Sequence, residues 1–150
     1  MKGEEGMMYE VDTTRINAQC DILQTALTVM EEVKENGNRD LMEQFAVARA
    51  IHLAVESVID VGNSLIDGFI MRDPGGYLDI IDILEDERVI PVESVAELKA
   101  LVYFRERLVR YYHEMKADEV WEWLNRTDVL SSYRGWIQSY LAKELEKEAL

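Results

Sequence analysis

IHLAVESVIDVGNSLIDGF, which spans residues 51–69, carries apolar residues at the three- and four-residue spacing of an α-helix. On a helical wheel one broad face is apolar, and it consists of Ile51, Val55, Val58, Ile59, Leu65, Ile66 and Phe69. A second face carries the smaller residues Ala54, Ser57, Val61, Ser64 and Gly68. Small side chains allow close contact between helices, so we expect this helix to be buried on two sides.

A polar stripe separates these two faces at steps of three or four residues, and it consists of His52, Glu56, Asp60, Asn63 and Asp67. Its carboxylates need water or hydrogen-bonding partners. Spacing of one turn could also place His52, Glu56 and Asp60 around a metal ion. The chain has no second ligand set of the Glu-x-x-His type, which favours a structural histidine and predicts neither a metal ion nor another cofactor.

Helix caps and apolar spacing divide the rest of the chain into about five helices. We expect helices from Asp12 or Thr13 to Asn36-Gly37, from about residue 40 to 70, through residues 77–84, from about 92 to 115, and from 118 to about 148 with a break near 125–128. Asp73 and Pro74 suit the N-cap and first turn of the third helix. No alternating β pattern persists. The predicted fold is therefore all-α, an antiparallel helical bundle.

Size and composition limit the class of protein. A chain of 150 residues is long enough for one hydrophobic core, so we expect a single domain over 1–150, with residues 1–8 as a flexible tail. No apolar run approaches the length of a membrane span, and the acidic start does not resemble a secretory signal. The single cysteine, Cys20, cannot form an internal disulfide, which fits the cytoplasm, and its helical context favours buried packing.

The net charge of −14 disfavours non-specific binding to nucleic acid over the whole surface, and we expect no DNA partner. RNA chemistry would need a local basic patch. The densest basic cluster lies near the end of the fourth predicted helix and consists of Arg105, Arg107, Arg110 and His113.

Arg105 falls near the centre of the apolar face of this helix. An unpaired guanidinium in an apolar interface costs several kcal/mol, so a carboxylate should lie opposite, and Glu56 and Asp60 are the candidates. Tyr112 lies within about 20° of Arg105 on the wheel and about 10 Å further along, so it could present its hydroxyl to the same groove. A structural ion pair, or an arginine whose head reaches water, explains Arg105 equally well.

Two segments carry a resemblance to a known family. Residues 51–73, which contain the run ESVIDVGN, and residues 104–112, FRERLVRYY, resemble the HepT-like branch of the HEPN proteins. The likeness spans about residues 8–145. It implies a homodimer of helical bundles with an Arg-x4-His-x-Tyr motif that cleaves RNA in active members, and a small nucleotidyltransferase antitoxin that can add AMP to the motif tyrosine.

The motif is only partly present in this chain. Its arginine matches Arg105 and its tyrosine matches Tyr112, whereas Arg110 stands at the histidine position and Glu106 replaces the common asparagine. An arginine cannot exchange a proton near neutral pH, although it can bind phosphate. His113 could substitute for the motif histidine, because Arg107 precedes it with five intervening residues, a looser form of the motif spacing. On a regular helix, however, Arg107 and His113 would lie about 120° apart.

Three hypotheses follow. The first is a HepT-like toxin acting as a metal-independent endoribonuclease, with Arg105 and Arg110 as phosphate-binding residues, Tyr112 as positioning or modified residue, and Glu56, Asp60 and Asn63 as support. The second is a catalytically reduced HEPN protein that binds RNA, a nucleotide or a nucleotidyltransferase partner without cleavage. The third is a structural dimer in which the Arg105 ion pair fixes the helix register.

Overall fold

The structure, a computed structural model, describes residues 11–149 and contains no strand within that range. Six α-helices follow one another along these residues: α2 (Thr13–Asn36), α3 (Leu41–Gly68), α4 (Tyr77–Asp86), α5 (Val95–Arg110), α6 (Ala117–Glu122) and α7 (Asp128–Ala149). Three short 3-10 turns connect them: η1 (Val92–Ser94), η2 (Tyr112–Glu114) and η3 (Trp123–Asn125). The predicted all-α bundle is confirmed. The expected tail, residues 1–8, lies outside the described residues.

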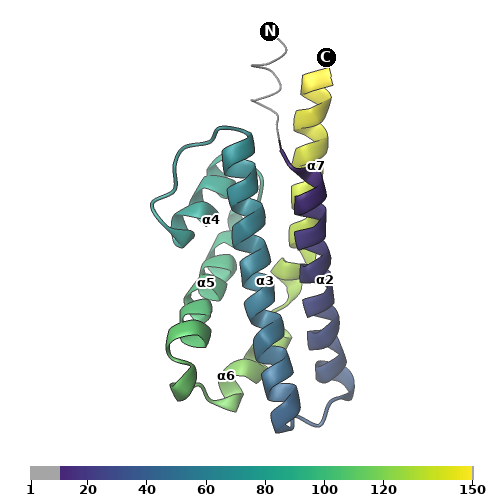
Figure 1. The fold of residues 1–150 in the computed structure, drawn as a ribbon, viewed down its shortest axis with the longest axis vertical. Helices are drawn as coiled ribbons and strands as arrows, with labels where there is room; N and C mark the ends of the chain where they lie inside the picture. Colours follow the sequence, from purple (N-terminus) through teal and green to yellow (C-terminus); the bar gives the residue numbers. More distant parts are fainter. Residues whose placement is uncertain (1–10, 150) are drawn as a thin grey trace.

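Helix α3 lies at the centre of the bundle, with α2 on one side and α4 and α5 on the other (Figure 1). Its first turn is closed by reciprocal caps, because Asp40 Oδ1 accepts from the Glu43 backbone N–H at 2.9 Å and Glu43 Oε1 accepts from the Asp40 backbone N–H at 3.3 Å. Ala54 from the small-residue face and Val55 from the apolar face are both fully buried. The prediction that this helix is buried on two sides is therefore confirmed.

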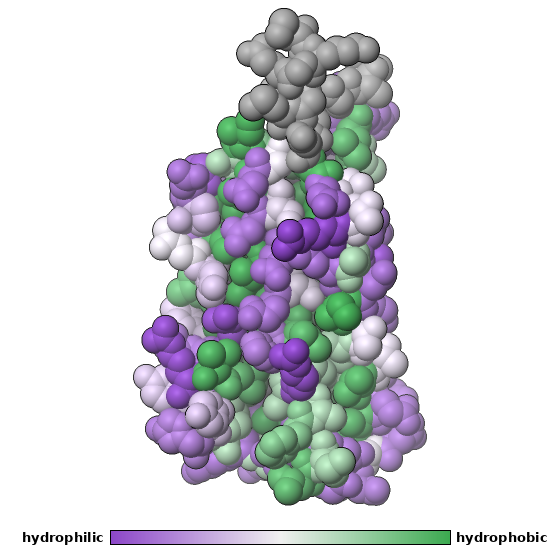
Figure 2. Space-filling view, in the orientation of Figure 1, coloured by the Kyte–Doolittle hydropathy of each residue, from purple (hydrophilic) through white to green (hydrophobic). Residues whose placement is uncertain are grey.

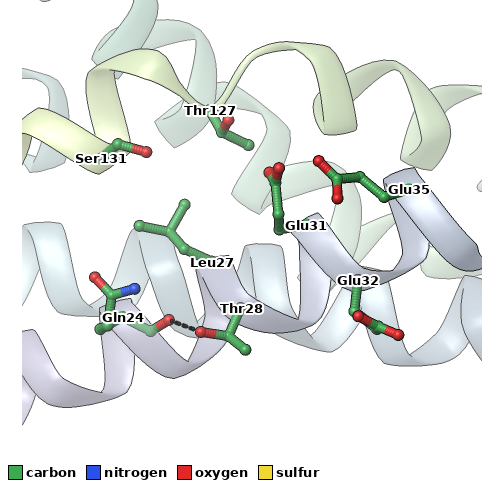
Figure 3. Close-up of a pocket in the computed structure, with 8 residues that line it drawn as sticks. All are labelled: Gln24, Leu27, Thr28, Glu31, Glu32, Glu35, Thr127 and Ser131. Carbon is green, nitrogen blue, oxygen red and sulfur yellow. Dashed lines mark hydrogen bonds between the residues drawn. The ribbon is translucent and has the colours of Figure 1, made fainter.

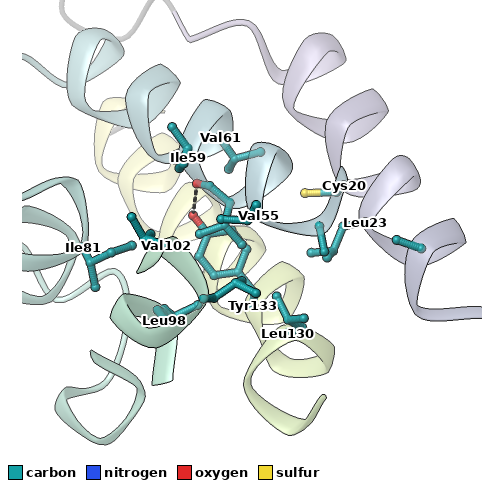
Figure 4. Packing of buried hydrophobic residues seen from close by; sticks show 14 of the residues in the cluster. Cys20, Leu23, Val55, Ile59, Val61, Ile81, Leu98, Val102, Leu130 and Tyr133 are labelled. Carbon is teal, nitrogen blue, oxygen red and sulfur yellow. Dashed lines mark hydrogen bonds between the residues drawn. The ribbon is translucent and has the colours of Figure 1, made fainter. Parts of the chain in front are cut away.

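Buried side chains from all the long helices pack together in one core (Figure 4). Tyr133 of α7 is fully buried, and its hydroxyl donates to the Val58 carbonyl of α3 at 2.9 Å, so this polar atom is paired within the core. Burial raises the pKa of the Tyr133 hydroxyl. Cys20 of α2 is also buried, and burial raises the pKa of its thiol, which confirms packing as its role.

Two predicted helix boundaries are wrong. Helix α4 begins at Tyr77 rather than behind an Asp73 cap, because the Asp79 carboxylate of its own first turn binds the Gly75 backbone N–H at 2.8 Å and closes the loop there. The fourth predicted helix, 92–115, is a 3-10 turn followed by α5, and α5 ends at Arg110. After Tyr111 the chain turns so that Met115 can pack against the core.

No helix within residues 11–149 is long and apolar enough to cross a membrane. The surface is nevertheless apolar at one end. Green surface gathers in Figure 2 at the lower end of the molecule, where α3 begins. Leu41, Met42 and Phe45 of the first turns of α3 are 68%, 81% and 69% exposed.

Candidate functional site

The centre of the candidate site is an ion pair between α5 and α3. Arg105 donates from Nε to Glu56 Oε2 at 3.0 Å and from Nη2 to Glu56 Oε1 at 3.1 Å. Both side chains are partly buried, and the hydrogen bonds to Glu56 raise the pKa of Arg105. A bidentate guanidinium–carboxylate pair fixes both groups in orientation. The prediction that a carboxylate of α3 faces Arg105 is confirmed for Glu56.

Tyr77, at the start of α4, completes the surroundings of this guanidinium. The Cζ atom of Arg105 lies 4.9 Å from the centroid of the Tyr77 ring, a distance typical of a cation–π contact. Nothing in the local pattern around Tyr77 predicts this role, since its contact with α5 depends on how α4 packs across the bundle. Within the described residues, Nη1 of Arg105 has no hydrogen-bond acceptor, so this nitrogen can donate to a further anion.

The other members of the polar stripe differ in their surroundings. His52 lies one turn before Glu56, with Nε2 3.4 Å from Glu56 Oε1. Asp60 forms no ion pair in the described part of the chain, and its pKa is raised by burial and then by the negative charge of Glu56. Asn63 is half-buried and makes no side-chain hydrogen bond to another described residue. Glu56, rather than Asp60, therefore joins the two helices electrostatically.

Tyr112 does not lie on α5, because it belongs to η2, and its side chain is 70% exposed. No contact between Arg105 and Tyr112 is present among the described residues, and the ring beside the guanidinium is that of Tyr77. Tyr112 instead borders a largely apolar hollow of about 380 Å³ between α3, α5 and α6. The walls of this hollow are formed by Gln44, Phe45, Ala48, Leu108, Tyr112, Met115 and Val120.

The predicted basic cluster is divided by acidic partners. Arg107 donates to Glu119 from both Nε and Nη2, at 3.1 and 2.8 Å, so its charge is compensated within the fold. Arg110 is 74% exposed, and its ionic neighbour among the described residues is Glu106, at 4.0 Å. His113 is 62% exposed and lies 3.4 Å from Glu114. Arg110 is therefore the member of the cluster best placed to meet a phosphate from solvent.

A second hollow, of about 400 Å³, lies between α2 and the start of α7 (Figure 3). Glu31, Glu32 and Glu35 line it, and a hydrogen bond between the Glu31 and Glu35 side chains raises the pKa of Glu35. This concentration of negative charge repels phosphate, so we do not place RNA there. Within residues 11–149, no group of three or more His, Cys, Asp or Glu side chains has a geometry suited to a metal ion.

Similar proteins agree with this architecture. "Putative RNase YutE" of Bacillus subtilis (strain 168) is 35% identical over 139 residues, which cover 92% of this chain and 95% of that protein. The structure of YutE, described as a cytosolic protein, superposes with a TM-score of 0.85 over 92% of this chain and 96% of YutE. A tri-AMPylated HEPN toxin of Shewanella oneidensis, solved with its MNT antitoxin, is 20% identical, with a TM-score of 0.70 over 86% of this chain and 96% of the toxin. That likeness shows a shared fold.

The sequence profile described as "Ribonuclease HepT-like" matches residues 16–134, which include α3, α5 and the Arg105–Glu56 pair. The match covers most of the chain and agrees with the resemblance found in residues 51–73 and 104–112. This chain therefore belongs to the HepT-like ribonuclease family of the HEPN superfamily.

Proposed function

We propose that this protein is the toxin of a toxin–antitoxin pair and cleaves RNA as an endoribonuclease without a metal ion. The observation that supports the proposal best is the arginine of the family motif, Arg105, held between two helices with Nη1 available to a phosphate oxygen. Hydrogen bonds from a preorganised guanidinium stabilise the charge that develops on phosphate during transfer. Arg110, exposed one and a half turns later, can bind a neighbouring phosphate.

Tyr112 has a separate role in this proposal. Its exposed ring borders the apolar hollow, where it can position an unstacked base, and its hydroxyl is accessible to a modifying enzyme. The fold shared with the AMPylated Shewanella toxin supports a nucleotidyltransferase antitoxin as partner and Tyr112 as the site that receives AMP. The cytoplasm as location and a homodimer as assembly belong to the same proposal.

A second function has one specific observation in its favour. Arg110 occupies the position of the motif histidine, and an arginine cannot act as an acid or base near neutral pH. A protein without any replacement for that histidine would bind RNA, a nucleotide or its nucleotidyltransferase partner and would not cleave. RNA binding without cleavage by the wild-type protein is the result that this alternative predicts.

The test is incubation of mixed RNA with the purified protein in the presence of EDTA, beside Arg105→Ala. We expect cleavage by the wild type and a loss of at least about 100-fold in the variant, because one phosphate-stabilising donor contributes about that much. Arg126→Ala is the matched control, since Arg126 forms an equally close bidentate pair, with Glu97 at 2.6 and 2.8 Å, outside the site. Equal losses in both variants, or EDTA-sensitive cleavage, would contradict the proposal.

A further inference from the structure

The reaction proposed above needs a group that exchanges a proton near neutral pH, and the motif position for it is occupied by Arg110. The chain contains two histidines. His113 is exposed on η2, and its described ionic neighbour is Glu114. His52 lies in the α3 stripe beside the Arg105–Glu56 pair. His52 therefore lies at the centre of the candidate site, and His113 does not.

The contacts of the His52 ring favour one tautomer. Nδ1 lies 3.2 Å from Nη1 of Arg49, and a guanidinium can only donate, so Nδ1 must accept. The ring proton then resides on Nε2, which faces the Glu56 carboxylate at 3.4 Å. Glu56 is itself held by both nitrogens of Arg105. A carboxylate on one ring nitrogen and a lone pair on the other is the arrangement that orients a histidine as a base, and here that lone pair accepts from Arg49.

We propose that His52 replaces the missing motif histidine as the catalytic base, an inference that rests on the proposed ribonuclease function. The lone pair of Nδ1 takes the proton of a ribose 2′-hydroxyl, and the 2′ oxygen attacks the adjacent phosphorus. The bond from phosphorus to the 5′ oxygen breaks, and that oxygen takes a proton from water. The products are a 2′,3′-cyclic phosphate and a 5′-hydroxyl end, and His52 returns its proton to solvent.

Two neighbours support this assignment. Arg49 is exposed and covers Nδ1 at present, so an approaching RNA phosphate would draw this arginine to itself and leave Nδ1 facing the ribose. Ala48, one helical turn before His52, lines the hollow that Tyr112 borders. His52, Arg49 and the wall of the hollow at Ala48 therefore follow one another along α3. In this arrangement Arg105 also acts as a positioning residue, through Glu56.

The experiment measures single-turnover cleavage of a fluorescent single-stranded RNA by the full chain. We expect His52→Gln to lower the rate constant by about 100-fold or more while RNA affinity changes less than about threefold, because general-base catalysis contributes 10²–10⁴-fold. His113→Gln is the matched control, with an expected change within about twofold. In His52→Ala, added imidazole should restore part of the rate, which a purely structural histidine would not allow. Thermal midpoints show whether each variant is folded.

The possible failures are distinguishable. A wild-type protein that binds RNA without cutting it contradicts the proposed function itself. A wild type that cleaves, with His52→Gln folded and active within twofold, overturns only the assignment of His52. A large loss in His113→Gln with His52→Gln unaffected transfers the base to η2. Products that end in a 3′-hydroxyl exclude the 2′-hydroxyl route.

Discussion

A single carboxylate, Asp79, orders the loop that brings Tyr77 to the site. Its Oδ2 accepts from Nη1 of Arg72 and from the Gly75 backbone N–H, both at 2.8 Å, and its Oδ1 accepts from Nη2 of Arg72 at 3.0 Å. These hydrogen bonds lower the pKa of Asp79 to about 2, and those from Arg72 have the largest effect. The folded state therefore prefers the ionised form more strongly than the unfolded chain does.

Because the folded pKa lies below the ordinary value of about 3.9, Asp79 contributes stability above about pH 4 and loses that contribution as the pH falls towards 2. We expect Asp79→Asn to lower the thermal midpoint at pH 7 and to approach the wild-type midpoint near pH 2. Asp73→Asn is the control, since Asp73 lies in the same loop and makes no hydrogen bond or ion pair with any described residue. An Asp79→Asn deficit that persists unchanged at pH 2.5 would contradict this account.

The contacts of a residue could be predicted from the sequence where its own chemistry requires a particular kind of partner. Arg105 cannot lose its charge, so its position on an apolar face was enough to require a partner, and Glu56 on the neighbouring stripe was a correct candidate. Tyr77 and the division of the basic cluster by Glu119 could not be foreseen, because both contacts depend on the packing of α4 and α6. The catalytic roles of these residues stay predictions.

At the scale of the helices, capping chemistry located α2, α3 and the break before α7 correctly. It failed at the end of α5, where residues 111–115 contain no glycine or proline and the helical pattern continues. The chain ends the helix there because Met115 and α6 gain core contacts, which outweigh local preference. This turn moves Tyr112 from the α5 face to the rim of the hollow, so the end of the helix decides which surface Tyr112 faces.

The contact between α3 and α4 depends on Gly62. A Cβ atom there would lie 2.8 Å from Ile80 Cγ2 and 3.2 Å from Leu84 Cδ1, and both side chains are buried and cannot move easily. In Gly62→Ala the helix-propensity gain of about 1 kcal/mol is opposed by an overpacking cost of about 1–3 kcal/mol. We expect a net loss of about 1 kcal/mol in the free energy of unfolding, measured by urea denaturation.

Gly135 of α7 provides the matched comparison, because a Cβ atom there meets nothing within 4 Å. In Gly135→Ala only the gain in helix propensity applies, so we expect the free energy of unfolding to rise by about 0.5–1 kcal/mol in the same urea experiment. If both alanine variants stabilise the protein, the α3–α4 interface is looser than the structure indicates.

At the scale of the whole molecule, the hydrophilic surface gives way to apolar surface at the end where α3 begins (Figure 2). Leu41, Met42 and Phe45 are the exposed apolar side chains in the first turns of this helix. The hollow bordered by Tyr112 shares Phe45 with this group. Monomeric proteins seldom leave large apolar side chains together in water, so we expect the two copies of the proposed homodimer to meet at this end. A dimer built there would bring a second copy close to the rim of the candidate site.

The homodimer can be tested by light scattering coupled to size-exclusion chromatography, where the wild type should elute with twice the chain mass of 17.4 kDa. We expect Met42→Glu to elute as a monomer, because Met42 is 81% exposed and a charge there costs the monomer little but would be buried in the dimer. Ile22→Glu, at an exposed apolar position on α2, should leave the dimer intact. If Met42→Glu stays dimeric while Ile22→Glu dissociates, the two copies meet through α2, and the rim beside Tyr112 faces solvent in the assembled protein.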